Sequence, residues 1–341
     1  MIIRSKAPLR LGLAGGGSDI KTYYDRYGGH VLNAAIGMYA YCILESADDG
    51  RVLFRAADLE IEETYGAEGV LPTNNPLMLH TGIYNRIVRD YNGGAPLSLR
   101  MITYSDAPAG SGLGSSSTLV VAIIKAYTEY LSLPLGEYDI ASLACTIERV
   151  DLGQAGGKQD QYAATFGGFN FMEFYKGEQV IVNPLRLKRW IRNELEASLV
   201  LFHTGVSRDS ANIISQQIAD TANEKPAVVE STHEVKRQAA LMKEALLRGD
   251  FREFSRCLLD GWRAKRNMAA SITNDFLDGL YRYVLDNGAE SAKISGAGGG
   301  GFMMIYTDPS KRTGLIRALK KKDGIVLTPG FTEIGTQAWR L

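Results

Sequence analysis

One glycine-rich stretch, from Pro108 to Thr118, constrains this chain more than any other feature. Three glycines alternate with small residues, four hydroxyl side chains follow, and apolar residues then recur at helical spacing from Leu119. A glycine-rich turn before a helix collects unpaired backbone N–H groups and the positive end of the helix dipole at one point. Phosphate binds at such a point, and serine hydroxyls add donors or a magnesium ligand. The predicted phosphate-binding residues are Gly110, Ser111, Gly112, Leu113, Gly114, Ser115, Ser116 and Ser117.

The same stretch has a simpler explanation as a plain helix cap, because serine and glycine are common just before helices. Three spaced glycines and four consecutive hydroxyls exceed what a cap requires, so we favour the phosphate loop. It is not a Walker A loop, since the chain contains no G-x-x-x-x-G-K-[ST] pattern.

Composition excludes several classes of function. The 38 basic and 38 acidic side chains cancel, which argues against general affinity for nucleic acid or for an anionic membrane. Three widely separated cysteines and four dispersed histidines form neither a disulfide framework nor a metal-binding spacing. The N-terminus lacks the apolar segment of a signal peptide, and no run of about 18 apolar residues occurs, so we expect a soluble, cytoplasmic protein.

The N-terminal segment contains a second glycine run. Residues 2–13 are expected to form a strand interrupted at Pro8, with a helix soon after it. Three consecutive glycines, Gly15–Gly17, lie between the two and leave backbone open to a ligand. Arg10 and Asp19 are the charged groups at the edges of this run. A plain strand–loop–helix joint would explain the run equally well.

The order of the remaining elements predicts an α+β protein with two domains. Strands come first, then the phosphate loop and helices, which indicates layers of helices on a sheet that is not all parallel. A chain of 341 residues has the length of two domains. Residues 183–196 are expected to cross between them, which gives an N-terminal domain over 1–185 and a C-terminal domain over 186–341.

Two acidic residues stand near each other before this crossing. Glu148 falls within an apolar helix expected over residues 138–152, and Asp160 falls in a glycine-bounded loop or short helix. Taken alone, each carboxylate is more simply explained as a solvated surface acid.

A third glycine-rich stretch, near the C-terminus, contains a G-x-G-x-x-G pattern at Gly296, Gly298 and Gly301. A dinucleotide site with this pattern needs a helix immediately after it. Residues 302–306 are short, apolar and followed by Thr-Asp-Pro, which predicts a strand instead. We therefore reject a dinucleotide site and expect a close packing surface against a ligand loop.

Together, the three glycine-rich stretches resemble the three motifs of the GHMP kinases, in the same order and across nearly the whole chain. The motifs are Ala7-Pro8-Leu9-Arg10 with Gly15–Asp19, then Pro108–Thr118, then Lys293–Gly301. The first looks most like the sugar-1-kinase branch that contains D-glycero-D-manno-heptose 7-phosphate kinases and fucokinases. The resemblance implies an N-terminal domain like the second domain of ribosomal protein S5, a ferredoxin-like C-terminal domain, and an active site in the cleft between them.

The resemblance also implies a role in catalysis for individual residues. Residues 110–117 would wrap the phosphates of ATP, with Ser116 and Glu148 as ligands of Mg²⁺. Asp160 would accept the proton of the sugar hydroxyl, and Arg10 would stabilise the transferring charge. Phosphoryl transfer needs residues with these roles, because it depends on in-line positioning, a metal that bridges the β and γ phosphates, and a group that orients the nucleophile.

The implied sugar site involves the first and third motifs. Asp19 would bind sugar hydroxyls, since an ionised carboxylate is an acceptor only. Gly15–Gly17 stands where galactokinases and mevalonate kinases carry Gly-Glu-His, which argues against galactose itself. A sugar that already carries a phosphate needs cationic partners, for which Lys158, Arg208 and Lys293 are candidates, although each would also fit a surface position. The implied substrate-binding residues are Gly16, Gly17, Ser18, Asp19, Lys158, Arg208, Lys293, Gly298 and Gly299.

The function that this resemblance implies is that of an ATP-dependent sugar kinase with Mg²⁺ as cofactor. It would phosphorylate the anomeric hydroxyl of D-glycero-D-manno-heptose 7-phosphate to give the 1,7-bisphosphate. Two alternatives stay open, namely a kinase of an unphosphorylated sugar such as L-fucose, and a non-catalytic module that binds nucleotide and sugar. The expected partners are a phosphosugar and ATP, with no nucleic acid and no membrane, and a homodimer stays open.

Overall fold

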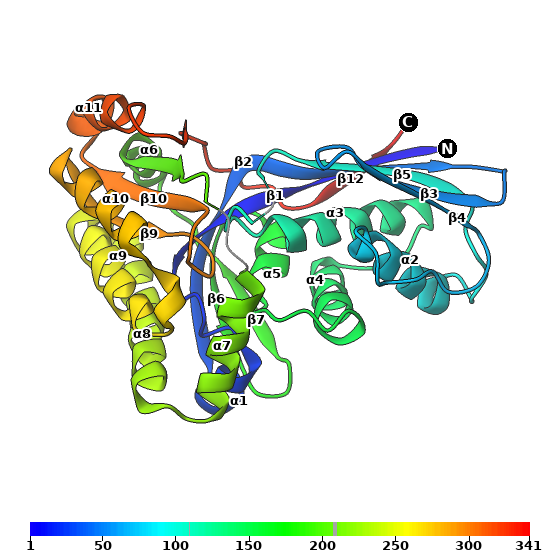
Figure 1. Cartoon of the computed structure of the whole chain (residues 1–341), viewed down its shortest axis with the longest axis horizontal. Coiled ribbons are helices and arrows are strands. Elements are labelled where there is room, and N and C mark those ends of the chain that lie inside the picture. The colour runs from blue at the N-terminus through cyan, green and yellow to red at the C-terminus, as the bar shows by residue number, and fades with distance from the viewer. Residues whose placement is uncertain (109, 207–209) are drawn as a thin grey trace.

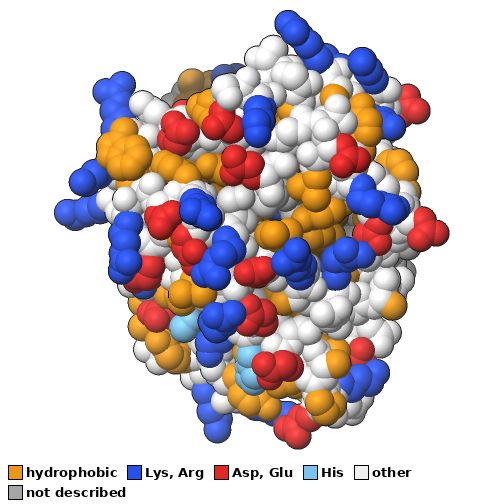
Figure 2. All heavy atoms as spheres, turned by 90° about the vertical axis from the view of Figure 1, so that its left-hand side faces the viewer, with side chains coloured by type: hydrophobic (Ala, Val, Ile, Leu, Met, Phe, Trp, Pro, Cys, Tyr) orange, Lys and Arg blue, Asp and Glu red, His pale blue; other side chains and the backbone are white. Residues whose placement is uncertain are grey.

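The computed structural model describes residues 1–108, 110–206 and 210–341, apart from the side chain of residue 210, and these form two β-sheets with helices packed on each (Figure 1). The α+β fold expected from the sequence is confirmed. No helix in these ranges is long and apolar enough to cross a membrane. On the face shown in Figure 2, basic and acidic side chains are interspersed, in keeping with the balanced charge.

The larger sheet has eight strands and is built around the long strand β2 (Gly29–Ser46). β2 pairs with β1 (Ile2–Ala14) along one side, and along the other with β5 (Leu99–Ser105) and β6 (Phe169–Phe174) at its two ends. Neighbouring strands are antiparallel except β3 and β5, which are parallel. The remaining strands are β3 (Arg51–Ala56), β4 (Ile61–Gly66), β7 (Val180–Pro184) and β12 (Gln337–Arg340).

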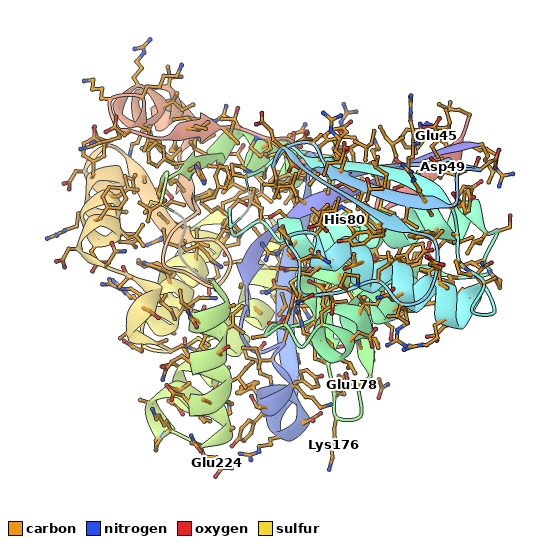
Figure 3. All side chains as sticks on the ribbon, turned by 45° about the vertical axis from the view of Figure 1, so that its right-hand side comes forward. Glu45, Asp49, His80, Lys176, Glu178 and Glu224 are labelled. Carbon is orange, nitrogen blue, oxygen red and sulfur yellow. The ribbon has the colours of Figure 1, made fainter. Side chains whose placement is uncertain are left out.

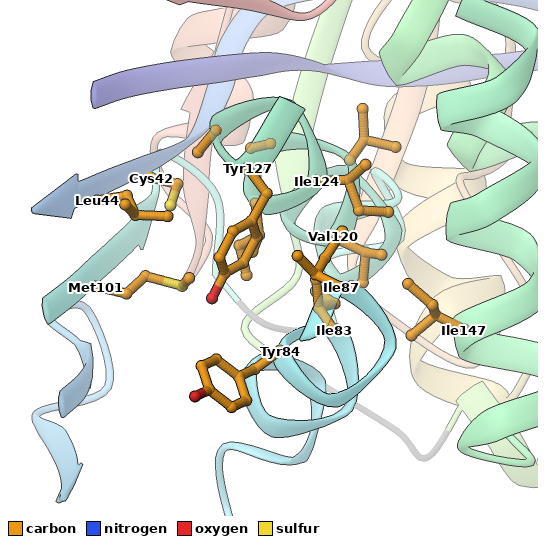
Figure 4. Close-up of a cluster of buried hydrophobic side chains, with 14 of the residues drawn as sticks. Cys42, Leu44, Ile83, Tyr84, Ile87, Met101, Val120, Ile124, Tyr127 and Ile147 are labelled. Carbon is orange, nitrogen blue, oxygen red and sulfur yellow. The ribbon is translucent and has the colours of Figure 1, made fainter. Parts of the chain in front are cut away.

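Helices cover one face of this sheet (Figure 1). They are α2 (Met78–Tyr91), α3 (Ser115–Tyr130), α4 (Glu137–Thr146) and α5 (Gln159–Phe166). α3 is apolar on most sides, as expected for a helix buried between a sheet and other helices. Val120, Ile124 and Tyr127 of α3 share a core with Leu44 and Met101 of the sheet (Figure 4). This packing holds the N-terminus of α3, where the phosphate loop ends.

The second sheet has four antiparallel strands in the order β11-β8-β10-β9. Numbered along the chain this order is 4-1-3-2, the arrangement of the ferredoxin-like sheet that the resemblance implies. The strands are β8 (Leu199–His203), β9 (Ala289–Ile294), β10 (Phe302–Thr307) and β11 (Ile325–Leu327). The helices of this half are α6 (Arg189–Ser198), α7 (Ser210–Ala222), α8 (Pro226–Arg248), α9 (Phe251–Arg266), α10 (Asp275–Asp286) and α11 (Pro309–Leu319).

A shared hydrophobic core joins the two halves. Leu9 and Leu11 of β1 are buried together with Met242 of α8, Phe254 of α9 and Phe302 of β10. α8 packs against β2, α9 packs against β1 and β9, and the short helix α1 (Lys21–Tyr27) packs against α7. The halves therefore meet along β1, next to the first glycine run.

Three local features differ from the sequence-based expectation. β1 runs through Pro8 without a break, and its pairing with β2 shifts register between Pro8 and Arg10, since proline has no N–H to donate. Residues 147–151 form a turn of π-helix after α4 instead of continuing an α-helix. β12 falls in the range 186–341 but pairs with β1 in the larger sheet. The division of the chain into 1–185 and 186–341 stays a prediction.

Candidate active site

A cavity of about 410 Å³ opens where the two halves meet, and residues of all three glycine-rich stretches border it. The first residues of α3 and α5, the π-helical turn, α7 and α9 complete its wall. The polar and charged side chains in this wall are Arg10, Asp19, Ser115, Ser116, Ser117, Glu148, Arg149, Gln154, Gln159, Asp160, Gln217 and Lys265.

The phosphate loop presents its backbone to this cavity. Gly110, Gly112 and Gly114 have φ angles of 71°, 78° and 77°, a region that residues with a Cβ rarely adopt. α3 begins at Ser115, directly after Gly114, and no described side chain caps its first turn. Its unpaired N–H groups and the positive end of the helix dipole therefore lie at the cavity wall, which suits an anion.

Two residues of the predicted loop turn away from the cavity. Ser111 and Leu113 are fully buried, and their side chains are not part of the described wall. The Leu113 carbonyl accepts the Arg10 N–H at 3.2 Å, and the Ser111 carbonyl accepts the Phe302 N–H at 2.9 Å. These bonds attach the loop to β1 and to β10, so both residues shape the loop from behind.

The third glycine-rich stretch packs directly on the phosphate loop. A Cβ on Gly296 would lie 2.7 Å from the Cα of Gly112, and a Cβ on Gly301 would lie 2.4 Å from the carbonyl oxygen of Ser111. Ser295 Oγ donates to the Gly112 carbonyl at 2.9 Å. The stretch is followed by the strand β10, so the expectation of a packing surface before a strand is met.

The glycines predicted to bind substrate are placed differently from one another. Gly17 borders the cavity, and Gly16 is its immediate neighbour. Gly298 and Gly299 are buried on another side of their stretch, where the Gly299 N–H donates to the Ile272 carbonyl at 2.8 Å. Ile272 ends a short 3-10 helix, Ala270–Ile272. The structure thus brings Gly17 to the cavity, places Gly16 in a small neighbouring pocket with Lys265 and Lys293, and puts Gly298 and Gly299 in a packing contact.

Arg10 and Asp160 form an ion pair in the cavity wall. Arg10 Nε and Nη2 each lie 2.7 Å from Asp160 Oδ1, and Arg10 Nη1 donates to the Gly112 carbonyl at 2.7 Å. The Arg10 side chain is 3% exposed, whereas 24% of the Asp160 side chain in the first turn of α5 is exposed. Charge-assisted bonds of this length are strong. Arg10 therefore holds the Asp160 carboxylate beside the phosphate loop and leaves it open to the cavity.

Glu148 stands on the π-helical turn and is 1% exposed. Ser117 Oγ donates to its Oε1 at 2.9 Å, and Gln161 Nε2 donates to its Oε2. Burial raises the pKa of the Glu148 carboxyl, while the charge of Arg149 and these two bonds oppose the rise. Single π-turns inside helices often mark functional positions, and no residue spacing in the sequence reveals this one.

The hydroxyls in the first turn of α3 have different surroundings. Ser116, the predicted metal ligand, is exposed at the cavity, whereas Ser117 is buried against Glu148. The sequence does not predict the hydrogen bond from Ser117 to Glu148. Mg²⁺ is usually held by one or two carboxylates together with phosphate oxygens and water. Glu148 and Ser116 offer only oxygen donors and border the same cavity as the predicted phosphate loop, so the residues present fit this ion.

Asp19 borders the cavity but already accepts backbone hydrogen bonds. Its Oδ2 accepts the N–H groups of Lys158 at 2.9 Å and Gln159 at 3.1 Å. Asp19 therefore binds the start of α5 through its N-terminal N–H groups and positions the helix that carries the central ion pair. Ser18 is buried and donates to the Gly15 carbonyl at 2.8 Å, which holds the glycine run in place.

The cations chosen from the sequence for a substrate phosphate are not part of the described wall. Lys158 Nζ forms an ion pair with Glu178. Glu178 lies in the turn between β6 and β7 (Figure 3). Lys293 Nζ is buried and donates to the Gly12 carbonyl at 2.7 Å. Arg208 lies outside the described residues.

A lysine that the sequence did not single out borders the cavity instead. Lys265 on α9 is 6% exposed, and its Nζ lies 3.4 Å from the Gly16 carbonyl oxygen. Burial lowers the pKa of Lys265 to about 8. The apolar stripe of α9 through Phe254, Leu258 and Trp262 predicts core packing, and Lys265 continues this stripe one turn later. A lysine on a stripe that otherwise faces the core is unusual, and this is the sequence feature that could have indicated Lys265 as a site residue.

Comparisons with known proteins show the family to which the chain belongs. Residues 79–168 match the GHMP kinases N terminal domain, and residues 242–324 match the GHMP kinases C terminal domain. The chain is 50% identical over 339 residues to D-glycero-alpha-D-manno-heptose 7-phosphate kinase of Campylobacter jejuni, with 99% of both chains covered. The crystal structure of a D-glycero-D-manno-heptose 1-phosphate kinase from Bacteroides thetaiotaomicron has a TM-score of 0.85 at 45% identity, with 99% of both chains covered.

The fold extends to more distant relatives. A Lactococcus lactis galactokinase complexed with galactose has a TM-score of 0.75 at 16% identity, over 98% of this chain and 95% of that one. The chain belongs to the GHMP kinases. Enzymes of this family use ATP as the phosphate donor, generally with Mg²⁺, and the chain is an ATP-dependent kinase of this kind.

Proposed function

We propose that this chain transfers the γ-phosphoryl group of ATP to the anomeric hydroxyl of D-glycero-D-manno-heptose 7-phosphate, which yields the 1,7-bisphosphate and ADP. One observation carries the chemistry: the Arg10–Asp160 pair lies beside the N-terminus of α3 in the cavity between the halves. Similarity over the full length to the Campylobacter jejuni relative supports the choice of acceptor.

Different residues of the cavity have different roles in the phosphoryl transfer. Backbone N–H groups of the phosphate loop and of the start of α3 hold the donor phosphates, where the helix dipole favours negative charge. Asp160 accepts the proton of the anomeric hydroxyl while the oxygen binds the γ-phosphorus and the bond from that phosphorus to the β-phosphate oxygen breaks. Arg10 orients Asp160, and its positive charge offsets the charge of the transferring group.

Glu148 and Ser116 are the residues that would hold Mg²⁺. When bound, this ion neutralises charge on the β and γ phosphates. Ser117 and Gln161 each donate to a different oxygen of the Glu148 carboxylate. The carboxylate is thereby oriented before a substrate enters, as in other metal sites with bonded ligands.

Release of ADP, measured in a coupled assay with ATP and Mg²⁺, tests the proposal on five acceptors. They are D-glycero-D-manno-heptose 7-phosphate, the corresponding 1-phosphate, mannose 6-phosphate, L-fucose and D-galactose. We expect turnover confined to the 7-phosphate, with the new phosphate on the anomeric carbon by ³¹P NMR. Turnover of the 1-phosphate would match the activity named for the Bacteroides relative and overturn the acceptor. Turnover of fucose alone would do the same, and ATP binding without ADP release would favour a non-catalytic module.

A further inference from the structure

Lys265 differs from the other cations of the cavity wall in its surroundings. Arg10 pairs with Asp160, and Arg149 Nη1 lies 3.9 Å from Glu148 Oε1. In the part of the chain that the structure describes, no carboxylate forms an ion pair with Lys265, and the charges of Asp19 and Asp160 act on it only from beyond ion-pair distance. Buried charges in proteins are normally paired, because an unpaired one loses its hydration without compensation. An ammonium in this position therefore favours an anionic ligand.

Two amide groups of the same wall also lack partners. Gln217 on α7 is 2% exposed and its Nε2 is buried without a hydrogen bond among the described residues. The Oε1 of Gln159, the first residue of α5, is in the same state. Nearly all buried polar groups in proteins are hydrogen-bonded. A cation, an amide donor and a carbonyl acceptor from three helices thus meet the cavity with capacity for a ligand.

The first glycine run provides the space next to these groups. A Cβ on Gly16 would lie 3.6 Å from Lys265 Nζ and 3.4 Å from Gln159 Nε2. A Cβ on Gly17 would lie 2.7 Å from Met268 Cε and 3.8 Å from Gln217 Oε1, so Gly17 packs closely against Met268. A side chain at Gly16 would occupy the region next to Lys265 and Gln159. The absence of a side chain there therefore leaves space beside these two groups.

We propose that Lys265 and Gln217 bind the phosphate group that the acceptor sugar already carries, and that Gln159 accepts a bond from a neighbouring hydroxyl. This assignment rests on the proposed function, since it requires a phosphosugar as acceptor. An ammonium and an amide N–H are both donors, as an anionic phosphate oxygen requires. Asp160 comes from the N-terminal half and Lys265 from α9, so the acceptor spans both halves with its anomeric hydroxyl at one end and its phosphate at the other.

Steady-state kinetics with two acceptors test this assignment, namely D-glycero-D-manno-heptose 7-phosphate and the same heptose without phosphate. For Lys265→Met we expect the KM of the 7-phosphate to rise about 10- to 100-fold, with less than about a 3-fold change for the free heptose. Lys265→Arg should recover part of the loss, and Gln217→Leu should raise the KM of the 7-phosphate by about 3- to 10-fold. The KM of ATP should stay unchanged in all three variants.

Lys236→Met serves as the matched control, because Lys236 on α8 donates its Nζ to the Tyr27 carbonyl at 2.6 Å, outside the cavity wall. It should leave the kinetic constants for both acceptors unchanged. A merely structural Lys265 would lower the melting temperature when replaced, whereas removal of an unpaired buried charge should leave it unchanged or raise it. Equal losses for both heptoses, or no loss for either, would overturn the assignment.

The wild-type measurements separate this assignment from the proposed function. If the wild type does not turn over the 7-phosphate, the proposed function fails, whatever the variants do. Inorganic phosphate then serves as the probe of Lys265. It should inhibit competitively against whichever acceptor is turned over, and Lys265→Met should weaken that inhibition about 10-fold or more. Inhibition of equal strength in wild type and variant would overturn the role of Lys265 on its own.

Discussion

Two groups of residues in the cavity wall differ in how their polar atoms are satisfied, and we call them the transfer end (Arg10, Asp160, Ser117 and Glu148) and the acceptor end (Lys265, Gln159 and Gln217). At the transfer end, Arg10 bonds Asp160 at 2.7 Å and Ser117 bonds Glu148 at 2.9 Å. At the acceptor end, Gln159 Oε1 and Gln217 Nε2 have no hydrogen-bond partner among the described residues. Lys265 makes one 3.4 Å contact to the Gly16 carbonyl oxygen, and the charges of Asp19 and Asp160 act on it without forming an ion pair. Groups that are already oriented stabilise a transition state without reorganisation. Groups that lack partners contribute most to ligand affinity, because they form their hydrogen bonds only when the ligand binds. Changes at the first end should therefore lower kcat, and changes at the second should raise the KM of the acceptor.

The largest expected effect follows from Asp160→Asn, which removes the proton acceptor and keeps its shape. We expect kcat to fall about 1,000-fold, within the range for loss of a general base, while the KM of the acceptor changes less than about 3-fold. Initial rates of ADP release over both substrates measure this, with circular dichroism as the control for folding. Near-normal turnover in a folded variant would remove Asp160 from the mechanism and with it the contrast between the two ends.

Glu148→Gln tests the second carboxylate of the transfer end. The amide keeps the volume and one acceptor oxygen but removes the charge that would hold Mg²⁺. We expect kcat to fall about 100-fold and the Mg²⁺ concentration for half-maximal rate to rise, because a divalent ion prefers a carboxylate. Titration of Mg²⁺ at saturating ATP and acceptor measures both quantities. A variant with an unchanged Mg²⁺ requirement would show that Glu148 orients other groups instead of the metal.

The same contrast explains what the sequence could predict. Glycine spacing located the phosphate loop and the third stretch, because the backbone conformation itself requires glycine there. The spacing alone favours a surface acid at Asp160, and only the family resemblance predicts a catalytic role for it, which stays a prediction. The sequence does not predict a site residue at Lys265, because the apolar stripe of its helix indicates core packing. Only the tertiary fold shows that this stripe ends at the cavity. Conversely, the charge of Lys158 and Lys293 predicts phosphate binding, but Lys158 pairs with Glu178 and Lys293 bonds backbone carbonyls, and these partners lie in segments distant in sequence.

At alkaline pH, binding of the acceptor phosphate by Lys265 should weaken, because the lysine loses its charge. Burial lowers the pKa of Lys265, the charges of Asp19 and Asp160 oppose the shift, the charge of Arg10 adds to it, and the resulting pKa is about 8. The ammonium is present below this pKa and lost above it, so kcat/KM for the 7-phosphate should fall about tenfold per pH unit above 8. In Lys265→Arg this fall should be absent, because a guanidinium stays charged. An identical fall in that variant would assign the titration to another group.

Ser116→Ala and Ser117→Ala should separate metal binding from positioning within the transfer end. Ser116 is exposed at the cavity, so its loss should lower kcat about 10-fold and weaken Mg²⁺ binding. Ser117 is buried against Glu148, so its loss should destabilise the fold by about 1 to 3 kcal/mol, the usual cost of an unsatisfied buried group, with a smaller effect on the Mg²⁺ requirement. Mg²⁺ titrations and denaturant unfolding distinguish the two. The reverse pattern would assign the metal to Ser117.

We expect the smallest effect for Lys158→Met, which tests whether Lys158 contributes to binding of the acceptor phosphate. Lys158 immediately precedes α5, yet its Nζ pairs with Glu178, whose side chain is 54% exposed. An ion pair with one exposed partner contributes little, so the melting temperature should change only slightly. The KM of the 7-phosphate should change less than about 3-fold, since this lysine lies outside the cavity wall. Kinetics beside Lys265→Met give the comparison directly. A rise for Lys158→Met as large as that for Lys265→Met would move the anionic end of the acceptor from α9 to the start of α5.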